Sequence, residues 1–150
     1  MRARIVTRFR CSATEFSRLL TRPASLVFAA APVLRFDPVD GTCFPERWET
    51  GTVLQLRLYL FGIIPAGWHG IELVRVDPEA GAMVSRERGR IAQVWNHRID
   101  FRETAPGRVE YADEIEIRAG LLTPLVWLFA QLFYRHRQRR WRKLLRRSAR

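Results

Sequence analysis

Cysteine and histidine are scarce in this chain, with two cysteines and three histidines among 150 residues. Cys11 and Cys43 do not stand at a metal-ligand spacing, and the sequence has no metal-ligand cluster and no glycine-rich phosphate loop. We therefore expect no metal and no cofactor. We interpret both cysteines as free thiols in a reducing compartment, while a disulfide between them stays open at the level of sequence.

Apolar runs long enough to cross a bilayer are also missing, since none reaches the ~18 residues that a transmembrane helix needs. Residues 24–34 follow an arginine-rich start and imitate a signal peptide, but Pro23 and Pro32 interrupt the apolar run. We therefore predict a cytoplasmic protein. The content of 47% hydrophobic residues argues against disorder and, at this length, favours one domain over residues 1–150.

Acidic residues are absent from residues 135–150, which contain nine of the 26 Lys and Arg residues. The other 134 residues carry 17 basic and 15 acidic side chains and are nearly neutral. A basic helix end is usually solvated, but Trp141, Leu144 and Leu145 alternate with the basic residues in a pattern that suits weak contact with an anionic membrane. Because no second basic patch and no reader motif is present, we do not expect nucleic acid binding.

Alternation of apolar and polar residues dominates the chain and predicts strands. Residues 2–10 alternate cleanly, with arginines on one face and Ile5 and Phe9 on the other. Ser12 and Glu15 have the spacing of a capping box, so a short helix follows, and Pro23 can open a second one. Further strands are expected at residues 52–61, about 68–76, 82–88, 93–103 and 108–118.

A long terminal helix over residues 123–147 follows, with Thr123 as its expected N-cap and Pro124 in the first turn. Its segment 125–134 is apolar almost all the way round, so it needs cover on more than one side. The sheet covers one side, and a dimer partner, a ligand or a membrane surface is left open for the rest. We predict an α+β fold in which a curved antiparallel sheet wraps around this helix, with two short helices near the N-terminus.

The element order and several motifs resemble the SRPBCC superfamily, also called START-like or Bet v 1-like, whose bacterial ligand-binding subgroup is related to polyketide cyclase/dehydrase-like proteins. The motifs are Trp95-x-His97-x-Ile99-x-Phe101, then Tyr111-x-Asp113-Glu114-x-Glu116, and the helix Leu122–Trp141. The chain departs from that subgroup at residues 89–94, which replace a Gly-Pro-aromatic stretch, and at Ile99, where a second histidine often stands. The resemblance implies a helix-grip fold with a cavity for a hydrophobic ligand.

The candidate catalytic residues lie on two strands that we expect to pair as a hairpin. If the inward faces stay together, paired residue numbers sum to 210 or 212, which places His97 and Asp113 directly or diagonally opposite each other, with Tyr111 nearby. A histidine held by a carboxylate can act as a general acid or base. A buried polar pair that only satisfies its own hydrogen bonds is the simpler interpretation.

The inward rows of the strands and of the terminal helix predict the wall of a ligand cavity. The candidate ligand-binding residues are Leu56, Leu58, Trp95, His97, Ile99, Phe101, Tyr111, Asp113, Val126, Phe129 and Phe133. The leading hypothesis is binding or transport of a lipid, quinone or polyketide-like compound. One alternative is a cyclase or dehydratase that uses His97 and Asp113, and another is a peripheral membrane or interaction protein that acts through residues 135–150. A homodimer is left open.

Overall fold

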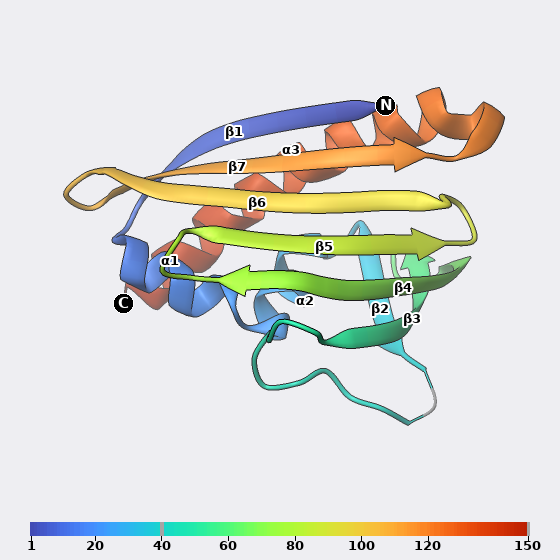
Figure 1. Cartoon of the computed structure of the whole chain (residues 1–150), viewed down its shortest axis with the longest axis horizontal. Coiled ribbons are helices and arrows are strands. Elements are labelled where there is room, and N and C mark those ends of the chain that lie inside the picture. Colours follow the sequence, from blue (N-terminus) through green and yellow to red (C-terminus); the bar gives the residue numbers. More distant parts are fainter. Residues whose placement is uncertain (40, 150) are drawn as a thin grey trace.

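The computed structural model describes residues 1–39 and 41–149, and it has the α+β architecture expected from the sequence. A curved antiparallel sheet follows the order β1-β7-β6-β5-β4-β3-β2, and one long helix lies along its concave face (Figure 1). The elements are β1 (Arg2–Arg10), α1 (Ala13–Leu20), α2 (Pro23–Ala30), β2 (Leu34–Pro38), β3 (Val53–Leu60), β4 (Ile64–Asp77), β5 (Ala82–Gly89), β6 (Val94–Ala105), β7 (Arg108–Arg118) and α3 (Thr123–Ser148). This is the helix-grip arrangement.

The first strand and the two short helices form where the sequence predicts them. The side chains of β1 alternate between exposed and buried along its length. The hydroxyl oxygen of Ser12 accepts a hydrogen bond from the backbone N–H of Glu15 at 3.1 Å, which satisfies one free donor at the start of α1. Pro23 opens α2. Both cysteines are free, with Cys11 buried and Cys43 exposed.

The β6–β7 hairpin has the second of the two expected registers. Paired residue numbers sum to 212, so His97 lies opposite Ile115 and Ile99 lies opposite Asp113. His97 and Asp113 are therefore diagonal neighbours on the same face of the sheet. This register places both side chains toward the interior, where His97 is 6% exposed and Asp113 is fully buried.

The edge of the sheet formed by β2, β3 and β4 differs in detail from the sequence prediction. Strand β2, which was not predicted, pairs with β3, and its five residues end at Pro38. The turn expected over residues 62–67 is shorter, because β4 already begins at Ile64. A register shift after Leu58 accompanies this tight turn, in which Phe61 and Gly62 both have positive φ angles of 53° and 76°.

The start of α3 also differs from the expectation. Thr123 is not the N-cap, because a 3-10 turn over Gly120–Leu122 precedes the helix and Leu122 occupies the cap position. The Thr123 hydroxyl instead closes this turn: it donates to the carbonyl of Gly120 at 2.7 Å and accepts from the N–H of Ala119 at 2.9 Å. Pro124 lies in the first helical turn, as predicted.

The basic C-terminal part of α3 packs against the body of the protein. Trp141 is 1% exposed, and its ring centroid lies 5.1 Å from that of Phe16 in α1. Leu145 is buried in the same cluster. Trp141 and Leu145 therefore lie in the core and are not available to a membrane surface, which corrects the interpretation of residues 135–150 as an interleaved membrane contact.

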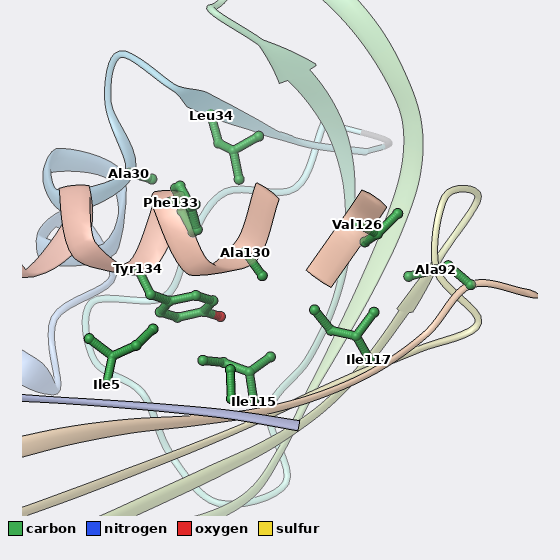
Figure 2. Close-up of a cluster of buried hydrophobic side chains, with 12 residues drawn as sticks. Ile5, Ala30, Leu34, Ala92, Ile115, Ile117, Val126, Ala130, Phe133 and Tyr134 are labelled. Carbon is green, nitrogen blue, oxygen red and sulfur yellow. The ribbon is translucent and has the colours of Figure 1, made fainter. Parts of the chain in front are cut away.

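A second cluster of buried apolar side chains joins the middle of α3 to the sheet (Figure 2). Ile115 and Ile117 of β7 lie below Ala130 and Val126 of α3, whereas Phe133 lies on the other side of the helix, toward Ala30 of α2. The sheet and α2 thus cover two sides of the apolar helix. The N-terminal half of α3 keeps a third, uncovered side on which Leu125, Leu128 and Leu132 are more than half exposed.

Candidate functional site

An apolar cavity of about 450 Å³ lies between the concave face of the sheet and the N-terminal half of α3. Its size falls within the usual range of roughly 300–1,000 Å³ for small-molecule sites. Strands β2 to β6, helix α2 and helix α3 all contribute to its wall. Polar groups are few, and they gather on the sheet side and at the α3 residues Tyr134 and Arg137.

The structure divides the residues expected on the cavity wall into two groups. Six of them line the cavity: Leu58, Trp95, His97, Val126, Phe129 and Phe133. The other five lie outside it: Leu56, Ile99, Phe101, Tyr111 and Asp113. Some inward-facing strand residues therefore line the cavity and others pack in the core, because only one end of the sheet borders the cavity.

The five residues that lie outside the cavity are buried in the interior of the protein. Ile99, Phe101 and Tyr111 belong to the cluster that includes Trp141, because α1 and the C-terminal half of α3 close that end of the sheet. Leu56 packs in a separate cluster with Trp48 and two other apolar residues. The expectation that all inward residues line the cavity was wrong for these positions.

Asp113 is the centre of a buried hydrogen-bond network. Its Oδ1 atom lies 2.8 Å from Nε2 of His97 and accepts a hydrogen bond from the Tyr111 hydroxyl at 2.6 Å. Its Oδ2 atom accepts from the side-chain amide of Gln138 at 3.0 Å, and this amide also donates to the carbonyl of Ile5. The predicted trio is thus brought together, but only His97 of the three reaches the cavity.

Charges and burial act in opposite directions on this network. Burial raises the pKa of the Asp113 carboxyl, but the Arg137 guanidinium and the hydrogen bond from His97 outweigh it, so the pKa lies below its usual range. Burial and the adjacent Asp113 charge hold the pKa of Tyr111 well above its ordinary value. Asp113 is therefore an anion at neutral pH and Tyr111 is a neutral donor.

A second histidine–carboxylate pair, which the sequence analysis missed, lines the cavity directly. Nε2 of His69 in β4 lies 2.8 Å from Oε2 of Glu87 in β5, and the Ser85 hydroxyl donates to the other oxygen of Glu87. Burial raises the pKa of Glu87, but the hydrogen bonds and charges of His69 and its neighbours lower it overall. Since both partners border the cavity, this pair is better placed for acid or base chemistry than His97 with Asp113.

The sequence contains a weak signal for the His69–Glu87 pair in the alternation of residues along β4. His69 shares a face of β4 with the buried residues Ile71 and Leu73, and Glu87 lies directly opposite Ile71. His69 and Glu87 are thus diagonal neighbours, as His97 and Asp113 are. The facing of β4 could not be assigned from its mixed pattern, so this diagonal relation was not found.

The cavity opens at a rim of apolar side chains. This apolar rim consists of Trp68, Ile91, Leu125, Leu128 and Leu132, each of which lines the cavity and is between 41% and 65% exposed. Large side chains of this kind seldom gather on a surface unless they contact something.

Other classes of site find no support in the part of the chain that the structure describes. No group of three or more His, Cys, Asp and Glu side chains there could hold a metal ion. None of the helices within residues 1–39 and 41–149 combines the length and hydropathy that crossing a bilayer requires.

The curved sheet, the long helix along it and the cavity between them have the helix-grip arrangement that the resemblance of the motifs implies. Residues 11–145 match the family described as a domain of unknown function, DUF8410, and the chain belongs to this family. No protein of curated function matches the sequence.

Solved structures with the same fold cover nearly the whole chain at low sequence identity. Protein CV1439 from Chromobacterium violaceum has a TM-score of 0.74 at 11% identity, with 96% of each chain covered. A START superfamily protein from Mycobacterium smegmatis has a TM-score of 0.70 at 10% identity, with 98% of each chain covered. The Zhui aromatase/cyclase from a Streptomyces species has a TM-score of 0.68 at 11% identity, covering 100% of this chain and 96% of that one. At such identities these likenesses show a shared fold.

Proposed function

We propose that this protein binds, and carries, a hydrophobic small molecule of the lipid, quinone or polyketide-like kind. The observation that supports this most strongly is the cavity of about 450 Å³ with its largely apolar wall. Protein interiors are packed like organic crystals and contain few voids larger than a water molecule. A cavity of this size that is poor in polar groups is a poor site for water, so an apolar occupant is the simplest reason for it. An aromatase/cyclase shares this fold, which supports the same proposal by analogy.

Native mass spectrometry of the protein purified from its own cells tests this directly, because a retained small molecule would appear as added mass. A second test uses N-phenylnaphthylamine, a neutral probe that fluoresces in apolar surroundings. Ala66 lines the cavity, so Ala66→Phe should fill part of it and weaken probe binding by about tenfold or more. Val53→Phe on β3 is the matched control, since Val53 is 61% exposed and outside the cavity wall. Equal probe binding by both variants and the wild type would refute the proposal.

The cyclase or dehydratase alternative is distinguished by the histidines. His97→Gln should change ligand affinity only modestly if the protein is a binder, whereas Phe129→Ala enlarges the cavity and should alter affinity. A compound that is turned over by the wild type and bound but not turned over by His97→Gln or His69→Gln would favour the enzyme. His69→Gln is included because the His69–Glu87 pair lines the cavity.

We also propose that the apolar rim contacts an anionic membrane surface when the ligand enters or leaves. Arg90 lines the cavity next to the rim residue Ile91, and the segments 88–91 and 118–135, which carry most of the rim, contain no acidic residue. Such a surface complements an anionic bilayer, and each basic residue near it contributes about 1 kcal/mol. We therefore propose that the membrane contact is made by the apolar rim and not by the C-terminal end of α3.

A further inference from the structure

One cationic side chain lies inside the cavity without adequate partners. Arg137 is 4% exposed and lines the cavity from α3. Within the described residues, its Nε atom is buried and has no hydrogen-bond partner, and the closest ion pair joins Nη1 to Oδ1 of Asp113 at 4.0 Å. That distance is too long for a hydrogen bond. A guanidinium has five N–H donors and no acceptor, so leaving it unpaired in the interior is costly.

Asp113 is a poor partner for Arg137 because the Asp113 oxygen that lies nearest to it, Oδ1, already accepts two hydrogen bonds. His97 and Tyr111 occupy Oδ1, and Gln138 occupies Oδ2. Asp113 therefore compensates the charge of Arg137 from a distance but does not receive its hydrogen bonds. Within the described residues, Arg137 thus has donors that face the cavity without a hydrogen-bond acceptor.

Tyr134, one helical turn before Arg137, offers a second donor to the cavity. Its hydroxyl oxygen accepts a hydrogen bond from Nε1 of Trp95 at 3.1 Å. Within the described residues, the hydroxyl group donates no hydrogen bond of its own. Burial raises the pKa of this phenol, so it stays a neutral donor. Tyr134 and Arg137 both line the cavity, and the Arg137 guanidinium carbon lies 5.5 Å from the Tyr134 ring centre.

We propose that Arg137 and Tyr134 bind a carbonyl oxygen of the ligand, whose apolar part then extends toward the rim. This inference rests on the proposed function and narrows the ligand to an apolar carbonyl compound, such as a quinone or polyketide-like molecule. A fatty acid fits less well, because a carboxylate would add a third negative charge to two buried ones near Arg137: Glu87, which borders the cavity, and Asp113, which lies behind its wall. A carbonyl oxygen supplies the missing lone pairs without adding a charge.

Three probes with the same methylated ring separate these possibilities: durene, a hydrocarbon; duroquinone, which carries two carbonyl groups; and tetramethylbenzoic acid, which carries a carboxylate. Calorimetric titration of the full chain should rank duroquinone above the other two. Arg137→Met keeps an unbranched stem but removes the donors, and it should weaken duroquinone binding by about tenfold to a hundredfold while leaving durene binding unchanged within about twofold. Tyr134→Phe should give a smaller loss of the same selectivity.

The carbonyl stretching frequency of bound duroquinone gives a readout that a merely structural role would not change. Hydrogen bonds from a cation lower this frequency, so the shift seen in the wild type should disappear in Arg137→Met and return in part in Arg137→Lys. Thermal unfolding of each variant confirms that it is folded, and Tyr134→Phe, which keeps every charge, tests the inference separately if Arg137→Met does not fold.

The outcomes distinguish this inference from the proposed function. If durene and duroquinone bind equally well and Arg137→Met alters neither, the cavity binds apolar molecules but the carbonyl site is wrong. If tetramethylbenzoic acid binds best, the ligand is an acid and the inference is overturned. If none of the three probes binds, and no mass is retained from the cells, the proposed function fails as well.

Discussion

The Nε2 atom of His97 lies 2.8 Å from Oδ1 of Asp113, and the two residues stand diagonally across the β6–β7 hairpin. The same diagonal relation joins His69 to Glu87 across β4 and β5. Each pair links neighbouring strands from the concave face of the sheet. They differ in surroundings, because Asp113 is enclosed by α3 and has no contact with the cavity, whereas Glu87 borders it.

Asp113→Asn should destabilise the fold strongly, by about 3–5 kcal/mol near neutral pH, because it leaves the buried charge of Arg137 without compensation. The shape of the side chain is retained, so the loss reports charge more than packing. Urea unfolding at pH 7 measures this difference. A loss below about 1 kcal/mol would show that Arg137 does not depend on Asp113.

The lowered pKa of Asp113 also predicts how the stability of the protein depends on pH. The pKa of Asp113 is lowered in the folded state, so its contribution is fully present above the unfolded value of about 3.9 and is lost as pH falls through the folded value. The stability gap between wild type and Asp113→Asn should therefore be constant from about pH 7 to 5 and should shrink below about pH 4. A gap that widens on acidification would contradict the lowered pKa.

Much of the fold could be predicted from local patterns, because alternation and turn residues act at short range. The clean alternation of β1 and the inward rows of β6 and β7 specify which side chains are buried, and the hairpin register then follows to within two choices. The facing of β4 could not be predicted because a register shift between Leu73 and Arg75 interrupts its alternation. Strand β2 is too short to have a pattern of its own.

The membrane contact predicted for residues 135–150 was wrong because the net charge of a helical segment does not show which of its sides is buried. Tyr134, Arg137, Gln138, Trp141 and Leu145 are all buried, and their spacing of three and four residues marks one helical face. The nine basic residues of 135–150, one of which is Arg137 itself, hid the signal. No local pattern, by contrast, could show that α1 and α3 close one end of the sheet and leave the cavity at the other, since this depends on packing between distant elements.

Trp141→Ala tests this corrected role of the helix. Because Trp141 is buried among Phe16, Tyr111 and their neighbours, its removal should cost about 3–5 kcal/mol of unfolding free energy. Trp68→Ala is the matched control and should cost much less, since Trp68 is 47% exposed. Chemical denaturation of both variants gives the comparison, and equal losses would mean that Trp141 is not part of the core.

The two thiols should react very differently. Burial, together with the charges of Glu15 and Glu103, raises the pKa of the Cys11 thiol to about 11, so only about one molecule in a thousand carries the reactive thiolate at pH 8. Cys43 is exposed. Titration of the folded protein with a disulfide reagent should modify one thiol quickly, and Cys43→Ser should abolish this fast phase while Cys11→Ser leaves it intact. A fast phase that survives in Cys43→Ser would show that Cys11 is accessible.

Binding to phosphatidylserine vesicles should depend on the apolar rim and less on the end of α3. Leu128→Ser with Leu132→Ser removes two exposed apolar contacts without touching the core, so vesicle pelleting should fall by about tenfold or more while the melting temperature stays nearly constant. The control variant, Arg146→Ser with Arg147→Ser, removes two exposed charges beyond the cavity and should lose less binding. Truncation before residue 135 is unsuitable as a test because it would delete the buried Trp141. If the leucine variant pellets normally and the arginine variant does not, the membrane contact lies at the end of α3. If the wild type does not pellet with the vesicles, the proposed membrane contact is refuted.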